Sequence, residues 1–378
     1  MVATLELSLT QMTHGGDALG RHDGQVVFVP GALPGERVRI RVADERRSFL
    51  RGELSEVLEP SPERIIPPCP YAATCGGCHW QHVAYPAQLA YKRAVVAEQL
   101  TRLGGLVEPP VAEPVACPAV WGYRNHCRFH RAGRGRWGFR AARSRTVVPV
   151  ARCLLAMEPI AAWLTAMHGQ DGPAEIGVRA LDDGVVTTLA PRPTHAQVGE
   201  THFRVSPDAF FQVNTPLLPT LVAQVVDGLG LNGGERVLDA YAGVGLFARF
   251  LAERAAAVVA VEAAPDAVAD ARANLAPFPH VEVIEGRAER VVPALAGPID
   301  TAVVDPPRAG CHPAVVTALA DHRVTRLIYV SCDPATLGRD ARRLTAAGYR
   351  LKAVVPIDLF PHTFHIETIS TCVWGGAI

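Results

Sequence analysis

The hydrophobic pattern of the chain changes near residue 232, where short apolar runs begin to alternate with stretches of helical periodicity. The apolar runs are ERVLDA, AAVVAVE, VEVIEG, IDTAVVD and RLIYVS, and helical stretches such as GLFARFLAER and PDAVADARANLA lie between them. Continuous apolar strands flanked by helices are typical of a parallel sheet that is covered on both faces. The pattern therefore predicts an α/β fold with a doubly wound sheet.

Residues 1–60 show a different pattern, in which short segments of alternating hydrophobic and polar residues are separated by turn signals. Segments such as LELSLTQ, RVRIRVADE and GELSEVLEPSP predict a small antiparallel β-barrel of about five strands. Small barrels of this kind often bind oligonucleotides, although the fold alone does not prove it. A proline-rich break, PSPERIIPPCP, follows the barrel.

Between the barrel and the predicted sheet lies a middle region with a cysteine cluster, a helical stretch around 86–103 and a second proline-rich connector at 104–118. An arginine-rich segment and short strands such as GVVTTLA complete this region, which ends near residue 207. These changes predict three domains, namely a barrel at 1–60, a middle domain at 61–207 and a catalytic domain at 208–378.

The composition is that of a globular protein, with 49% hydrophobic and 20% charged residues and a net charge of zero. The overall charge gives no sign of a nucleic-acid partner, but its distribution does, because residues 121–153 contain nine arginines and no Asp or Glu. Of the 37 basic residues in the chain, 35 are Arg and only Lys92 and Lys352 are Lys. Part of the arginine content therefore reflects compositional bias, and a solvated basic face is the alternative to an RNA contact.

No N-terminal segment has the basic-then-apolar pattern of a signal peptide, and no run approaches 18 apolar residues, so we expect a cytoplasmic protein without a membrane segment. The nine cysteines are then more readily core thiols, metal ligands or catalysts than disulfides. Three with C-x5-C-x2-C spacing and one further along form a candidate cluster: Cys69, Cys75, Cys78 and Cys153. Four thiolates suit a four-iron cluster or tetrahedral zinc, and the spacing leaves both open, with His79 and His82 as further zinc ligands.

Polar residues stand at the ends of four predicted strands: Asp239, Glu262, Asp305 and Cys332. In parallel sheets ligands bind beyond the carboxyl ends of the strands, so these side chains are expected along one edge. Cys332 taken alone would be interpreted as a buried apolar residue, because free cysteine is among the most buried residue types. Its place beside three other edge residues makes it a candidate nucleophile.

The turn in LDAYAGVGLFA, at 238–248, is a candidate cofactor site. Gly243 and Gly245 let the backbone approach a ligand closely, and the start of the next helix offers free amides. Glu262, at the end of the following strand, suits a ribose diol. Because this turn lacks G-x-G-x-x-G, a pyrophosphate cofactor is disfavoured and S-adenosylmethionine is favoured.

Three further motifs carry candidate chemistry. VVDPPRAG, at 303–310, places a rigid pair of prolines directly after Asp305. FFQVN, at 210–214, offers the amides of Gln212 and Asn214 to a pyrimidine edge, while its two phenylalanines are expected mainly in the core. In LFPHTFHIETISTCVW, at 359–374, period-2 alternation puts His365 and Glu367 on one face of a strand.

These motifs, with the clustered cysteines, GYRNHCRFH and SCDPATLGRD, resemble the RNA 5-methyluridine methyltransferases over nearly the whole chain. The likeness is to the bacterial branch with an N-terminal TRAM barrel and an iron–sulfur cluster. It implies a class I methyltransferase fold, S-adenosylmethionine as methyl donor and a four-iron four-sulfur (4Fe-4S) cluster on the four cysteines. It also implies Cys332 as nucleophile and Glu367 as general base, with the cofactor bound by Gln212, Tyr241, Gly243, Gly245, Glu262 and Asp305.

Three residues depart from the family pattern. Many relatives carry a small polar residue in place of Leu246 and Asp or Asn in place of Arg287, so only the backbone could contact a cofactor at these positions. His126 stands where a lysine is usual. The partner implied by the resemblance is RNA, with large-subunit ribosomal RNA (rRNA) expected, transfer RNA (tRNA) as the alternative, and a monomeric enzyme.

Three other functions stay open at this stage. A cytosine-5 RNA methyltransferase would also use cysteine attack, but the D-P-P motif here lacks the second catalytic-type Pro-Cys. A non-catalytic RNA-binding protein with a decayed methylase domain is disfavoured by the presence of Cys332, Glu367 and Gly243. An iron–sulfur redox enzyme is the third.

Overall fold

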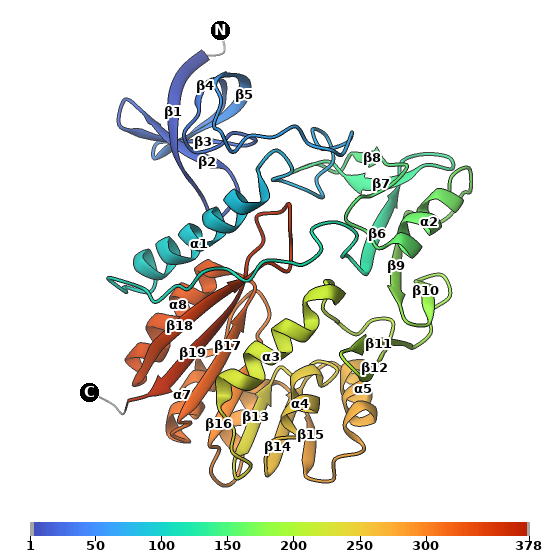
Figure 1. Ribbon diagram of the computed structural model, residues 1–378, viewed down its shortest axis with the longest axis vertical. Helices are drawn as coiled ribbons and strands as arrows, with labels where there is room; N and C mark the ends of the chain where they lie inside the picture. The colour runs from blue at the N-terminus through green and yellow to red at the C-terminus, as the bar shows by residue number, and fades with distance from the viewer. Residues whose placement is uncertain (1–3, 376–378) are drawn as a thin grey trace.

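The structure, a computed structural model, describes residues 4–375. Figure 1 shows the N-terminal barrel at one end of the molecule, the middle region to one side, and the large sheet of the second half at the other end. Among the described residues, no helix is both long and apolar enough to cross a membrane.

The N-terminal strands form a closed barrel with the order β1-β2-β3-β5-β4. They are β1 (Thr4–Met12), β2 (Ala18–His22), β3 (Gln25–Val29), β4 (Arg37–Glu45) and β5 (Phe49–Glu59). Alternate residues such as Leu7, Leu9, Val38 and Ile40 point inward and form its core. The expected five-stranded barrel is confirmed, although β3 and β5 pair in parallel.

The middle region is built on a sheet of order β10-β9-β6-β7-β8 with a separate hairpin, β11–β12. Its elements are β6 (His126–Arg131), β7 (Trp137–Arg140), β8 (Val147–Pro149), α2 (Glu158–Ala166), β9 (Glu175–Leu181), β10 (Gly184–Thr187), β11 (Thr194–Val198) and β12 (Thr201–Val205). Helix α2 covers one face of the sheet, where Phe129, Trp137, Ile160 and Ile176 are buried together. This small core is formed by residues that follow Cys69, Cys75 and Cys78 along the chain.

The large sheet has the order β15-β14-β13-β16-β17-β19-β18. Its elements are η1 (Thr215–Leu217), α3 (Leu218–Leu229), β13 (Arg236–Ala240), α4 (Leu246–Leu251), β14 (Ala257–Glu262), α5 (Pro265–Leu275), β15 (Val281–Glu285), α6 (Ala288–Val291), η2 (Val292–Ala294), β16 (Thr301–Val304), α7 (Pro313–Asp321), β17 (Arg326–Ser331), α8 (Pro334–Ala346), β18 (Tyr349–Ile357) and β19 (Glu367–Trp374). Strands β13 to β17 run parallel, and β19 lies antiparallel between β17 and β18. Helices α3, α4 and α5 cover one face, and α6, α7 and α8 cover the other, so the predicted doubly wound α/β sheet is confirmed.

Helix α1 (Tyr85–Arg102), which the sequence placed in the middle domain, packs against α8 of the large sheet. Its residues Val96 and Leu100 share a core with Leu337. The two helices approach closely at Gly338, where an added Cβ would lie 2.7 Å from the carbonyl oxygen of Gln99. Helix α1 therefore connects the cysteine-rich segment to the catalytic sheet.

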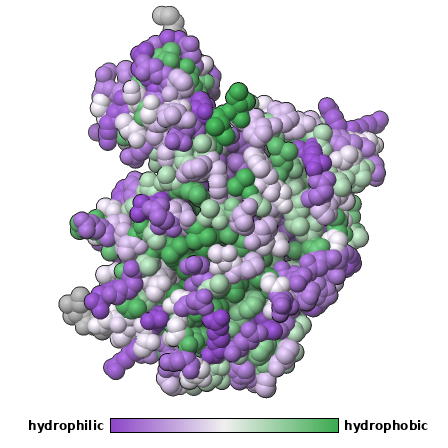
Figure 2. Space-filling view, viewed as in Figure 1, coloured by the Kyte–Doolittle hydropathy of each residue, from purple (hydrophilic) through white to green (hydrophobic). Residues whose placement is uncertain are grey.

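Figure 2 shows hydrophobic residues gathered across the middle of the visible face, in the area of α3. An open groove between α3 and strands β18 and β19 is lined there by Pro219, Ala223, Val355 and Ile369. Asp227 is the one titratable residue in its lining. Because its lining is mostly apolar, this groove offers no catalytic chemistry.

Candidate active site

The carboxyl ends of the parallel strands meet at one edge of the sheet. The register pairs Asp239 with Ala260 on one side and with Val303 on the other, so β13, β14 and β16 end at the same level. Glu262 ends β14, Asp305 follows β16 directly, and Cys332 follows β17 directly. The structure therefore brings together at one edge the four residues that the sequence placed at strand ends.

The turn after β13 is built for close approach by a ligand. Gly243 and Gly245 have φ angles of 57° and 84°, and Tyr241 is a rare non-glycine residue with a φ of 66°. The carboxylate of Glu262 accepts hydrogen bonds from the amide of Gly243 at 2.8 Å and from those of Ala263 and Ala264 at 2.7 and 2.8 Å. Glu262 is thus fixed beside the turn, half-buried, with its carboxylate at the edge of the site.

Asp239 has a structural position beneath this turn. It is fully buried and accepts a hydrogen bond from the amide of Ala248 at 2.9 Å, which anchors the start of α4. Burial raises the pKa of Asp239 to about 7, with Asp305 and Glu262 adding to the effect. Leu246 is buried in the core and Arg287 is exposed, so the Leu246 side chain is turned away from the site.

Three acidic groups meet on the other side of the edge. Glu367 opens β19, whose register places Thr368 opposite Ser331, so Glu367 lies next to Cys332. Burial, together with Glu367 and Asp305, raises the pKa of Cys332 to about 11, while Arg308 acts in the opposite direction. Burial raises the pKa of Asp305 to about 7. Burial and the nearby Asp305 also raise the pKa of Glu367 well above its ordinary value.

Sequence reasoning missed Arg308, which stands in the quoted D-P-P-R motif and lies close enough to lower the pKa of both Cys332 and Glu367. It is the one cation among the groups that act on both. The sequence feature that could have indicated Arg308 is its place directly after a rigid proline pair at a strand end. A cation in this position favours the thiolate and the carboxylate, which are the reactive forms of both groups.

The turn that carries Cys332 is fixed by its neighbour Asp333. The Asp333 carboxylate caps α8 by accepting a hydrogen bond from the amide of Thr336 at 2.8 Å, and it lies 3.4 Å from Nε2 of His14 in the barrel. Although burial acts to raise the pKa of Asp333, hydrogen bonds from His14 and from Thr336 lower it to about 2. The barrel therefore contacts the residue next to the candidate nucleophile, which the sequence did not indicate.

The segment 206–214 contacts the loop that leads into β19, because Nδ2 of Asn214 donates a hydrogen bond to the carbonyl of Leu359 at 3.0 Å. Gln212 is 7% exposed, and its backbone carbonyl accepts a hydrogen bond from Nδ2 of Asn125 at 3.0 Å. Phe211 is buried as expected, but Phe210 is 68% exposed, so the expectation of a core role for Phe210 is wrong. Phe203 packs against Phe211, whereas Phe210 is left outside this contact.

The clustered cysteines lie close enough to influence one another electrostatically. All four are free thiols, and burial raises the pKa of Cys78 to about 12 with further contributions from the other three, Cys69, Cys75 and Cys153. Among residues 4–375, no group of His, Cys, Asp or Glu side chains is close enough to hold a single metal ion. A tetrahedral zinc site needs sulfurs at about 2.3 Å from one ion. A four-iron cluster binds one thiolate per iron, so it also requires four cysteines near one another.

Comparisons with known proteins agree with this geometry. A family model described as tRNA (Uracil-5-)-methyltransferase matches residues 195–372, and one described as TRAM domain matches residues 2–55. An uncharacterized RNA methyltransferase of Streptomyces coelicolor is 36% identical, covering 97% of this chain and 92% of its own. One of Halalkalibacterium halodurans is 30% identical, covering 97% and 96%.

Among solved structures, the tRNA (uracil-54, C5)-methyltransferase of Pyrococcus abyssi, in complex with S-adenosyl-L-homocysteine, is similar with a TM-score of 0.77 at 23% identity. The match covers 98% of this chain and 100% of that one, so the fold is shared from end to end. The doubly wound sheet with its row of polar strand-end residues, the N-terminal barrel and these relatives define the class of the protein, which is a methyltransferase that acts on RNA. The chain belongs to the family of S-adenosylmethionine-dependent RNA (uracil-5-)-methyltransferases.

Proposed function

We propose that this enzyme methylates carbon 5 of a uridine in large-subunit rRNA, with Cys332 as nucleophile and Glu367 as general base. The observation that carries the proposal is the meeting of Cys332, Glu367 and Asp305 at one edge of the sheet, beside a cofactor turn. The three predicted domains, at 1–60, 61–207 and 208–378, would then bind RNA, hold the cluster and carry out the reaction. We take the enzyme to act as a monomer.

The chemistry requires a nucleophile because carbon 5 of uracil is too weakly nucleophilic by itself. The Cys332 thiolate adds to carbon 6 and converts the ring to an enolate, whose carbon 5 can accept an electrophilic methyl group. Glu367 then removes the proton from carbon 5, and the carbon–sulfur bond breaks to release the thiolate. A cysteine without a base within reach would stall as a covalent adduct with the RNA.

S-adenosylmethionine, when bound, supplies the electrophilic methyl group. The residues proposed to bind it are Gln212, Tyr241, Gly243, Gly245, Glu262 and Asp305. The fixed carboxylate of Glu262 suits a ribose diol, and the positive φ angles at Gly243 and Gly245 open the turn for a close approach. Gln212 and Asp305 face the acceptor side as well and are proposed to contact the uracil.

The target base must leave its helix or loop, because stacking covers the reacting face. Phe210, exposed beside the buried Gln212, offers a surface on which a displaced base can stack. The nine arginines of 121–153 support phosphate contacts, since all but Arg124 are exposed. Among the described residues, only three of the nine, Arg128, Arg143 and Arg152, form ion pairs.

We further propose that the four cysteines, Cys69, Cys75, Cys78 and Cys153, hold a 4Fe-4S cluster that braces the middle domain and takes no part in methyl transfer. Their mutual proximity supports this assignment. Iron and sulfide content and visible absorption after anaerobic purification test whether it is present. Chelating the iron is expected to weaken RNA affinity, and unchanged affinity would count against the bracing role.

A second candidate substrate is tRNA, because the matching family model and the similar Pyrococcus abyssi enzyme are both described as acting on tRNA. The test uses two pools of transcripts tritiated at carbon 5 of uridine, one of rRNA fragments and one of tRNAs. Tritium release to water is expected from the rRNA pool only. Release from the tRNA pool alone would reassign the substrate.

The same assay tests the nucleophile. Cys332→Ala is expected to abolish release, whereas the matched control Cys372→Ala, which removes a buried thiol from β19 away from the edge, is expected to keep it. No release from either pool by enzyme that binds S-adenosylmethionine would refute uridine methylation.

A further inference from the structure

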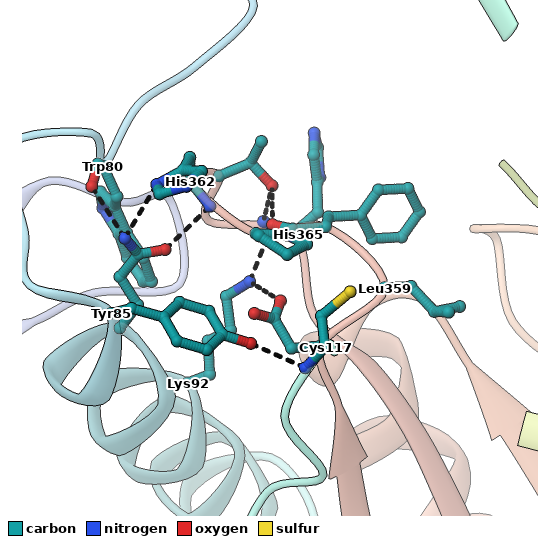
Figure 3. Close-up of polar contacts among 12 residues, drawn as sticks. Trp80, Tyr85, Lys92, Cys117, Leu359, His362 and His365 are labelled. Carbon is teal, nitrogen blue, oxygen red and sulfur yellow. Dashed lines mark hydrogen bonds and ion pairs between the residues drawn. The ribbon is translucent and has the colours of Figure 1, made fainter. Parts of the chain in front are cut away.

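Helix α1 presents three polar residues on one face, Tyr85, Gln88 and Lys92, at the spacing of successive helical turns. Figure 3 shows Lys92 directed toward the loop of residues 358–365, which leads into β19, and Tyr85 directed toward Cys117. Tyr85 accepts a hydrogen bond from the amide of Cys117 at 2.8 Å, and the other two reach the loop itself. A helix more than 260 residues away in sequence thus contacts the segment that delivers Glu367.

Lys92 and Asp358 form a buried ion pair. Their side chains are each 1% exposed, and Nζ of Lys92 lies 2.6 Å from Oδ1 of Asp358 and donates to the carbonyl of Phe360 at 3.0 Å. Because 35 of the 37 basic residues in the chain are Arg, a lysine at this position indicates that the site requires an ammonium group. The compact ammonium fits between two acceptors on one loop, which the flat guanidinium fork would not.

Gln88 and His362 form the second connection. Gln88 is fully buried, and its Oε1 accepts a hydrogen bond from the His362 amide at 2.8 Å while its Nε2 lies 3.2 Å from Nδ1 of the same residue. His362 has a φ of 64°, in the left-handed region that a histidine adopts only when its surroundings require it. Its ring stacks on Trp121 with centroids 3.8 Å apart.

The loop also forms hydrogen bonds with the cysteine-rich segment and with the segment 206–214. The carbonyl of His362 accepts hydrogen bonds from the amides of His79 and Trp80, both at 3.0 Å, directly after Cys78. Nδ2 of Asn214 donates to the carbonyl of Leu359 at 3.0 Å, which joins the loop to the segment of Gln212. The backbone of the loop is therefore held from three sides before it reaches Glu367.

We propose that Lys92 and Gln88 are positioning residues for the general base, acting through Asp358 and His362 to set where Glu367 enters the site. This proposal rests on the assignment of Glu367 as base. Cys332 is held separately, by β17 and by the Asp333 cap of α8. Loosening the loop should therefore impair proton removal from carbon 5 more than addition of the thiolate to carbon 6.

The consequence is specific, because slow proton removal leaves the methylated RNA attached to Cys332. A misplacement of about 1 Å can cost about 100-fold in rate. To test the Lys92 connection, we expect the double variant Lys92→Met/Asp358→Asn, which replaces the ion pair by neutral groups of similar size, to lower tritium release about 100-fold. The fraction of RNA in an adduct that survives denaturing electrophoresis should rise, with RNA affinity unchanged.

Two further variants test whether the effect comes from the loop and not from a general loss of folding. His362→Gly keeps the left-handed backbone without strain but removes the ring contacts, so it should show a smaller rise in adduct together with a smaller loss of release. Lys352→Met removes the other lysine, which is exposed on β18, and should behave like the wild type. Thermal melting by circular dichroism verifies that each variant is folded.

The outcomes separate this proposal from the proposed function. If wild-type enzyme releases tritium and Glu367→Gln accumulates adduct, but the α1 and loop variants lose adduct and release in parallel or lose neither, the positioning role is refuted. If wild-type enzyme releases nothing, or Glu367→Gln forms no adduct, the assignment of the reaction or of the base fails first.

Discussion

The cofactor side and the acceptor side of the edge are built in different ways. Apart from Gln212 and Asp305, which are proposed to serve both sides, the cofactor side comes from one short stretch, in which β13, the glycine turn and the end of β14 contact one another through residues 239–264. The acceptor side combines Gln212, Asp305, Cys332 and Glu367 with supports at α1 and His14. The cofactor side is thus a local structure, whereas the acceptor side depends on the tertiary assembly of the whole chain.

The largest effect expected from this difference lies on the acceptor side. Glu367→Gln keeps the shape of the side chain but removes the base, and general base catalysis typically contributes about 1,000-fold. Tritium release should fall by about that factor while S-adenosylmethionine affinity, measured by calorimetry, stays at the wild-type value. A parallel loss of cofactor affinity would mean that the two sides are not independent.

A smaller effect is expected on the cofactor side. Glu262→Gln retains a hydrogen-bond acceptor but removes the charge that three backbone amides contact. Charge-assisted hydrogen bonds support a loss of about 10- to 100-fold in S-adenosylmethionine affinity. RNA affinity, measured by filter binding, should not change. The exposed Glu282→Gln on neighbouring β15 is the matched control, and an equal loss in that variant would contradict a specific role for Glu262.

The smallest expected change is in pH dependence, which tests the acidic groups of the acceptor side together. The pKa of Cys332 is raised to about 11 by burial and by Glu367 and Asp305, and the pKa of Glu367 is raised as well. Both groups react in their deprotonated forms, so kcat/KM should rise with pH, by about tenfold per unit wherever only the thiol still titrates. Single-turnover kinetics with saturating cofactor measure this slope.

A variant of Arg308 gives a second test of the pH dependence of kcat/KM. Because it lowers the pKa of Cys332 and of Glu367, Arg308→Met should move the profile toward higher pH. A profile that peaks in the acidic range, or one that Arg308→Met leaves in place, would show that these groups do not control the rate.

The difference between the two sides also explains what the sequence could predict. The strand ends, the glycine turn and the five-stranded barrel follow from short patterns, and the structure has them as expected. The exposure of Phe210, the contact of His14 with Asp333 and the packing of α1 on α8 are set by segments far apart in the chain. Lys92 carried a signal as a lysine in an arginine-rich chain, but nothing nearby in sequence indicated its partner Asp358.

The insertion of β19 between β17 and β18 has a consequence for how the protein folds. Strand β18 is made before β19, and within the large sheet it pairs only with β19, apart from bridges to the connector at Val111 and Val115. It therefore joins the large sheet only when β19 docks. Docking this strand closes a long-range contact, which is typically a slow step in folding. Glu367 begins β19, so the proposed base comes to lie beside Cys332 only at that step. The last strand of the sheet to be made is therefore also the one that completes the proposed catalytic pair, so a chain that has not docked β19 has the thiol without its neighbour.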